Sequence, residues 1–109
     1  MTIKSFLVLK RILPEYKSLI REVVIAKDKT LENDYSEEIR KLCEKYKVNY
    51  ILRKGFKNFK TKYVLVLTWR WLVYQKSKKI ILFHDSILPK YRGFCPVINS
   101  LINGEKKLA

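Results

Sequence analysis

Residues 79–96 read Lys79-Ile80-Ile81-Leu82-Phe83-His84-Asp85-Ser86-Ile87-Leu88-Pro89-Lys90-Tyr91-Arg92-Gly93-Phe94-Cys95-Pro96. The stretch begins with a short, continuous apolar run, which is typical of a buried strand in a mostly parallel sheet. Pro89 and Gly93 then predict a loop, and Pro96 can open a helix at its first position. Ligands of open α/β sheets bind outside the carboxyl ends of the strands. His84, the only histidine of the chain, follows directly on the predicted strand and is therefore a candidate functional residue.

The segments around this stretch alternate between helical and strand patterns. Apolar spacing predicts helices over residues 5–13, 34–46 and 95–102. Short β-branched or apolar runs predict strands over residues 22–26, 48–52, 63–68 and 79–83. We expect Pro14 to end or kink the first helix, and Asp34 with Glu37 to form a capping box on the second. This alternation favours a Rossmann-like α/β fold, a three-layer sandwich with a mostly parallel sheet.

The two ends of the pattern depart from a complete doubly wound fold. Such a fold opens on a strand whose first turn binds ligand, whereas this chain opens on a helix, and Met1-Thr2-Ile3 is too short for the strand. The last predicted helix stops near Asn103-Gly104, close to the final residue. We therefore expect a single, incomplete α/β domain over residues 1–109, without its first strand and its C-terminal part.

The formal net charge of +14 raises the question of nucleic-acid binding. Lysines account for 18 of the 24 basic residues and are scattered along the chain, whereas nucleic-acid readers favour arginine forks. The best candidate patch is residues 54–62, in which basic residues alternate with Phe56 and Phe59. We favour the alternative that this segment is a solvated loop whose phenylalanines pack on the sheet.

The cysteines and the apolar runs exclude several other classes. Cys43 and Cys95 lie far apart in the sequence, and one histidine cannot complete a familiar zinc site with them, so we expect no metal and two reduced thiols. No apolar run approaches the ~20 residues of a membrane helix, and the start lacks the order of a signal peptide. We expect a cytoplasmic protein that does not bind membranes.

Two segments together resemble the 10-formyltetrahydrofolate-dependent formyltransferase family. They are His84 to Gly93, followed by Pro96, and Leu101-Ile102-Asn103-Gly104-Glu105. The family pattern is an Asn, one spacer, a catalytic His, Ser-Leu-Leu-Pro, a basic-Gly loop and a helix that ends in Asn/Ala-Gly-Asp/Glu. The family includes methionyl-tRNA formyltransferase, glycinamide ribonucleotide formyltransferase and enzymes that formylate nucleotide-linked amino sugars. Residues 33–39 and 68–72 are similar to the amino-sugar branch, and the resemblance spans nearly the whole chain.

The resemblance implies formyl transfer from 10-formyltetrahydrofolate to an amine, foremost that of a nucleotide-linked amino sugar, with methionyl-tRNA as the alternative. Attack on the formyl carbon creates a developing oxyanion, which needs hydrogen-bond donors and a group that takes the amine proton. His84 matches the family histidine that polarises the formyl group. The residues implied to hold the folate are Trp69, Arg70, Trp71, Leu72, Ile87, Leu88 and Pro89. The residues implied to bind the amine substrate are Tyr91, Arg92 and Gly93.

Two departures from the family pattern leave other functions open. Leu82 stands where the family has the Asn donor, and the family Asp lies farther downstream than this chain extends. Loss of one oxyanion donor typically costs ~10²–10³ in rate. The alternatives are a non-catalytic remnant of the family and a small basic nucleic-acid-binding protein. Trp71 and Leu72 fit a place in the core as well as a place in a folate pocket.

Overall fold

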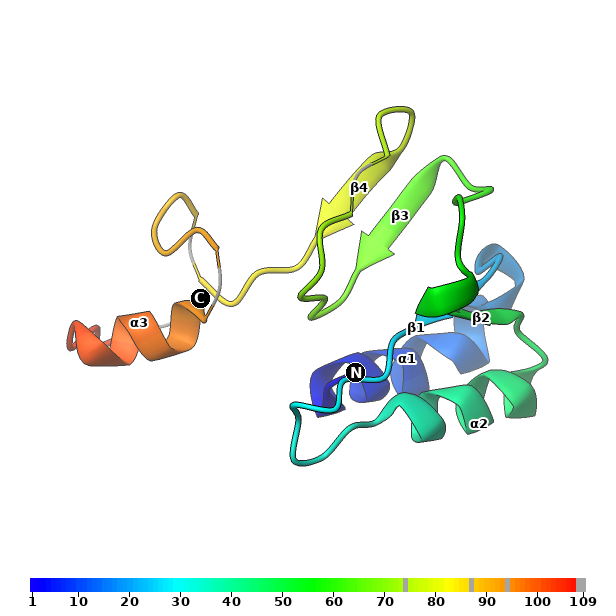
Figure 1. Cartoon of the computed structure of the whole chain (residues 1–109), viewed down its shortest axis with the longest axis horizontal. Helices are drawn as coiled ribbons and strands as arrows, with labels where there is room; N and C mark the ends of the chain where they lie inside the picture. Colours follow the sequence, from blue (N-terminus) through cyan, green and yellow to red (C-terminus); the bar gives the residue numbers. More distant parts are fainter. Residues whose placement is uncertain (74, 87, 94, 108–109) are drawn as a thin grey trace.

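The computed structural model describes residues 1–73, 75–86, 88–93 and 95–107. Its helices are α1 (Ile3–Tyr16), α2 (Ser36–Tyr46) and α3 (Pro96–Ile102), with 3₁₀ turns at η1 (Lys17–Leu19) and η2 (Arg53–Gly55). Its strands are β1 (Val23–Ile25), β2 (Tyr50–Leu52), β3 (Tyr63–Val66) and β4 (Lys79–Leu82). β1 pairs in parallel with β2, and β3 pairs in parallel with β4 (Figure 1). The predicted α/β class with parallel strands is thus confirmed, with the strands arranged as two separate pairs in the described part of the chain.

The first two helices differ from their predicted forms at the ends. α1 continues past Pro14 to Tyr16 and then tightens into η1. Pro14 lacks the backbone donor of its own position, but the backbone N–H of Lys17 still bonds the Leu13 carbonyl, and so the turn beyond Pro14 stays closed. The predicted capping box on α2 is wrong, because Glu37 pairs with Arg40 instead. Asp34 alone supports this helix start, with its carboxylate accepting a 2.9 Å hydrogen bond from the backbone N–H of Ser36.

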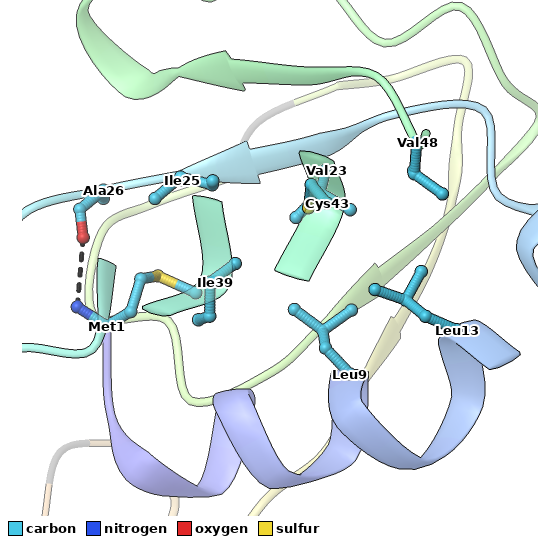
Figure 2. Packing of buried hydrophobic residues seen from close by; sticks show 9 residues of the cluster. All are labelled: Met1, Leu9, Leu13, Val23, Ile25, Ala26, Ile39, Cys43 and Val48. Atoms are coloured by element: carbon cyan, nitrogen blue, oxygen red, sulfur yellow. Dashed lines mark hydrogen bonds between the residues drawn. The ribbon is translucent and has the colours of Figure 1, made fainter. Parts of the chain in front are cut away.

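The hydrophobic core lies between α1, α2 and β1 (Figure 2). Leu13, Ile39 and Cys43 are completely buried there. Burial raises the pKa of the Cys43 thiol to about 11, and so this thiol is protonated at neutral pH. The core members are Met1, Leu9, Leu13, Val23, Ile25, Ala26, Ile39, Cys43 and Val48.

The prediction of a buried strand over residues 79–83 is wrong. All four residues of β4 are exposed, and Phe83, just beyond the strand, is 61% exposed. α1 and α2 pack with the β1–β2 pair, while α3 lies apart from both sheets (Figure 1). The radius of gyration of 15.0 Å reflects this projecting arm, since a compact domain of this length would have about 13 Å.

The N-terminus is anchored at the carboxyl end of β1. The Met1 ammonium donates to the Ala26 carbonyl at 3.0 Å and pairs with Asp34 at 2.6 Å. Asp34 also accepts hydrogen bonds from the backbone N–H groups of Asp28 and Ser36. Burial on its own raises the pKa of Asp34, but the ammonium and these hydrogen bonds outweigh it and hold the pKa well below its usual range. Asp34 therefore links the start of α1 to the β1–α2 connection.

We expect this carboxylate to make the fold sensitive to acid. The pKa of Asp34 is lower in the folded chain than the ~3.9 of an unfolded aspartate. Its stabilisation is therefore fully present above about pH 4 and is lost as the pH falls through the folded-state value. In urea titrations, Asp34→Asn should lower the free energy of unfolding at neutral pH and weaken its acid dependence. The exposed Glu15→Gln is the control, and equal acid dependence of Asp34→Asn and wild type would contradict the assignment.

Candidate functional site

His84 lies two residues beyond the last residue of β4, at the start of a loop that turns back on itself. Its Nε2 is 2.9 Å from the Tyr91 carbonyl oxygen. A carbonyl oxygen only accepts, and so Nε2 carries a proton in this arrangement. Inside the same loop, the buried Ser86 hydroxyl donates to the Lys90 carbonyl at 2.8 Å. The Ser86 bond closes the loop, and the bond from Nε2 to the Tyr91 carbonyl leaves Nδ1 as the ring nitrogen that can accept a proton.

Glu105, which follows α3, ties this loop to the end of the helix. Its carboxylate accepts from the Tyr91 hydroxyl at 3.0 Å and pairs with Lys90. The hydrogen bond from Lys90 lowers the pKa of Glu105, and the same contact raises the pKa of Lys90. Both groups are therefore charged at neutral pH. Tyr91, whose carbonyl accepts from His84, is also held through its hydroxyl by Glu105.

The second predicted segment, Trp69 to Leu72, follows β3. Arg70 Nη1 donates to Asp28 at 2.8 Å and to Thr30 at 2.7 Å. The hydrogen bond from Arg70, together with those from Thr30, lowers the pKa of Asp28 to about 2. Arg70 thereby joins this segment to the loop after β1.

The two tryptophans of this segment face the core. They meet edge to face with ring centroids 5.0 Å apart, and the Arg53 guanidinium lies 4.6 Å from the Trp71 ring. Both rings pack partly buried against the core cluster. Leu72 is 92% exposed, and so the interpretation of Leu72 as a core residue is wrong.

The first turn of α1 contacts both segments. β3 and β4 are parallel neighbours, so their carboxyl ends lie at one edge of that sheet. Thr2 hydrogen-bonds Thr68 at 2.7 Å, immediately before Trp69. Lys4 pairs with Asp85 at 2.8 Å, immediately after His84. The structure thus brings the predicted histidine and the predicted folate segment to the same end of α1.

The remaining predicted residues lie on the outer side of the loop. Leu88, Pro89, Arg92 and Gly93 are exposed, and Ile87 lies outside the described residues. Gly93 has φ of +108°, a conformation that side chains disfavour, and this explains glycine at that position. A hollow of about 140 Å³ lies beside Arg70 and Trp71, whereas pockets for drug-sized ligands are usually ~300–1,000 Å³.

Four contributors had no predicted role in the site: Lys4, Asp28, Thr30 and Glu105, of which Glu105 appears only as part of the family motif. Their partners lie 14 to 81 residues away along the chain. Asp28 and Thr30 carry a local signal, since the Asp28 carboxylate accepts from both the backbone N–H and the hydroxyl of Thr30. An Asp followed two residues later by Thr is typical of such a turn, and the pattern marks a preorganised acceptor for Arg70.

Comparison with known proteins assigns the chain. A family model described as formyl transferase matches residues 12–108. The chain therefore belongs to the formyl transferase family, whose members generally use 10-formyltetrahydrofolate. No curated protein and no solved structure matches the chain.

Two features are absent from the described residues. No group of three or more His, Cys, Asp or Glu side chains there is arranged to hold a metal ion. Within the same residues, no helix combines the length and the apolar character that crossing a membrane requires.

The geometry predicts the tautomer of His84. Because the Tyr91 carbonyl accepts from Nε2, the neutral ring should carry its proton on Nε2 and leave Nδ1 unprotonated. The chain has one histidine, so a long-range ¹⁵N–¹H spectrum of the imidazole contains a single set of signals. We expect the Nε2–H pattern for the neutral ring. A predominant Nδ1–H pattern would show that the ring is not held by the Tyr91 carbonyl.

Proposed function

We propose that this chain takes part in formyl transfer from 10-formyltetrahydrofolate to the amine of a nucleotide-linked amino sugar, as a catalytic-domain fragment spanning residues 1–109. The observation that carries the proposal is the position of His84. The chain belongs to the formyl transferase family, and His84 is its only histidine. This residue lies just beyond a parallel strand, and its Nε2 bonds the Tyr91 carbonyl of the loop. Methionyl-tRNA is the alternative amine substrate.

His84 would act on the reacting centre through Nδ1. With Nε2–H held by Tyr91, a neutral Nδ1 is an acceptor that can take the proton of the attacking amine. Once that proton has moved, the imidazolium can donate from Nδ1 to the oxyanion of the tetrahedral intermediate. As the intermediate collapses, the bond between the formyl carbon and N10 of the folate would break, and the imidazolium would return the proton to N10, which releases tetrahydrofolate and restores the neutral ring.

The other residues would bind rather than react. Trp69, Arg70, Trp71 and Leu72, with the loop of Ile87, Leu88 and Pro89, would contact the flat pteridine through aromatic and aliphatic surfaces. Tyr91, Arg92 and Gly93 would meet the amine substrate. Arg92 is exposed, and a guanidinium fork suits the phosphates of a nucleotide-linked sugar.

A second candidate function is folate binding without catalysis. Leu82 replaces the amide donor of the family pattern and is 57% exposed, so no side-chain donor stands at that position. A family member with this feature would bind the cofactor but turn over slowly.

Calorimetric titration with 5-formyltetrahydrofolate, a stable isomer of the donor, tests the binding part of the proposal. Saturable binding that changes little between low and moderate salt is the expected result. Leu72→Asp should weaken it, because Leu72 offers its exposed side chain at the segment proposed to meet the pteridine. If folate does not bind, and instead single-stranded RNA binds with an affinity that falls steeply with salt, the basic-protein alternative replaces formyl transfer.

A further inference from the structure

The turn that follows β3 holds a threonine in an unfavourable backbone conformation. Thr68 has φ of +43°, in the left-handed region. Among the non-glycine residues with positive φ in the described part of the chain, Thr68 alone has a branched Cβ. Branched side chains clash with the backbone in this region, and so such a conformation persists only where the surrounding structure holds it. The contacts of Thr68 therefore maintain a conformation that the residue disfavours.

Two hydroxyl side chains at the start of α1 make these contacts. Thr2 Oγ1 lies 2.7 Å from Thr68 Oγ1, and the Ser5 hydroxyl is hydrogen-bonded to the same atom. Ser5 also donates to the backbone carbonyl of Leu67 at 3.2 Å. We call Thr2, Ser5 and Thr68 the hydroxyl cluster. The cluster joins α1 to both the side chain and the backbone of the turn.

The partners fix the direction of each hydrogen bond in the hydroxyl cluster. The Leu67 carbonyl can only accept, and so the single hydroxyl proton of Ser5 goes to it. Ser5 then accepts from Thr68, and Thr68 accepts from Thr2. Each of these hydroxyl protons thus has its acceptor. Removal of the Thr68 hydroxyl would break the chain in the middle, because this group both donates and accepts.

The hydroxyl cluster lies directly before the segment proposed to hold the folate. Trp69 follows Thr68 in the chain, and Arg70 is bound by Asp28 and Thr30. The segment is therefore held on one side by the cluster and on the other by the Arg70 contacts. The φ of Thr68 sets the direction in which the chain leaves β3, and so the cluster controls where the segment begins.

We propose that the hydroxyl cluster positions residues 69–72 for the pteridine of the folate by holding Thr68 in its left-handed conformation. This inference rests on the function proposed for that segment. Ser5 is completely buried, and so it acts on a ligand only through the turn. Without the cluster, the segment would adopt its binding conformation for only a fraction of the time. The apparent affinity for folate would fall by that fraction.

Calorimetric titration of the whole chain with 5-formyltetrahydrofolate tests the inference through matched variants. Thr68→Val keeps the branched shape but removes the hydroxyl, and it should weaken binding about tenfold or more. Thr68→Ser keeps the hydroxyl and should bind close to wild type. Thr61→Val is the control, because it removes a hydroxyl that donates to the Tyr63 carbonyl near the opposite end of β3. It should bind as wild type does.

A glycine variant covers the case in which Thr68→Val does not fold. Thr68→Gly adopts positive φ without strain and also lacks the hydroxyl. It should therefore fold and show the same loss of affinity. A glycine variant with wild-type affinity would mean that the turn needs no hydroxyl to take its place.

A double-variant cycle separates positioning from independent effects on the fold. Ser5→Ala should weaken binding as Thr68→Val does, and the double variant should bind no more weakly than either single variant, because all three break the same hydrogen-bond chain. Trp69 and Trp71 are the only tryptophans, and their edge-to-face contact should give an exciton couplet in circular dichroism. Thr68→Val and Ser5→Ala should reduce this couplet in the absence of ligand, whereas Thr61→Val should keep it.

The possible failures point to different parts of the account. Wild-type affinity or an unchanged couplet in Thr68→Val and Ser5→Ala would overturn the inference and leave the proposed function standing. Additive losses in the double variant, or equal losses for Thr68→Ser and Thr68→Val, would do the same. Absence of folate binding by the wild type would overturn the proposed function together with the inference.

Discussion

His84→Gln is expected to reduce the rate constant kcat of formyl transfer by ~10²–10⁴, the usual contribution of a positioned acid–base group. In the wild type the Tyr91 carbonyl accepts from His84 Nε2 at 2.9 Å, and the amide group of glutamine can still donate to it. Glutamine, however, has no nitrogen that can accept the amine proton. The effect should fall on kcat rather than on folate affinity, because the imidazole is proposed to act on the reacting centre. Initial rates at saturating donor and calorimetric affinity of the same preparation separate the two quantities.

The neighbouring Asp85→Asn is the matched control. Asp85 is exposed and pairs with Lys4 on the surface, and an ion pair of this kind contributes little to stability. Its replacement should leave kcat close to wild type. A His84→Gln variant with the rate of Asp85→Asn would mean that the histidine has only a structural role in the loop.

Leu82→Asn is expected to raise kcat by up to ~10²–10³, the contribution of one oxyanion donor. Leu82 is the last residue of β4 and is 57% exposed, and so an amide at this position is hydrated in the free protein. The substitution should therefore cost little folding stability. Single-turnover rates with excess protein make the gain measurable even where the wild-type rate is low.

Ile80→Asn, two residues earlier on the same strand, separates a specific donor from a general effect of polarity on β4. It should give no gain in rate, because Ile80 lies farther from the carboxyl end at which His84 follows. Equal rates for Leu82→Asn and wild type would show that another group already supplies the donor, such as a backbone N–H of the loop.

Local sequence patterns predicted the elements of the fold well. Helices and strands of the described residues fall within the predicted segments or extend them by a few residues, because apolar spacing and β-branching act over neighbouring positions. The end of α3 at Ile102, followed by Asn103 as the C-cap and Gly104 at φ of +67°, follows from the same local rules. Burial was predicted less well. β4 is apolar but exposed, because burial depends on whether a distant element such as α3 covers it.

The site could be predicted only in part for the same reason. The position of His84 beyond a strand could be predicted from the apolar run that precedes it. The family of the chain could be predicted from the motif around this histidine. The proton on Nε2 depends on the Tyr91 carbonyl across a loop, and the position of Arg70 depends on Asp28, 42 residues away. Hydrogen bonds over such separations are set by the folded chain and have no fixed spacing in the sequence.

Mass spectrometry of the acceptor after incubation with 10-formyltetrahydrofolate is the most direct test of formyl transfer by this chain. A nucleotide-linked amino sugar and methionyl-tRNA are offered in parallel, to wild type, Leu82→Asn and the double variant with His84→Gln. The account predicts one added formyl group on the amino sugar, more product with Leu82→Asn, and loss of product with the double variant. Formation of equal amounts of product with and without His84, or no product from any variant with either acceptor, would contradict it.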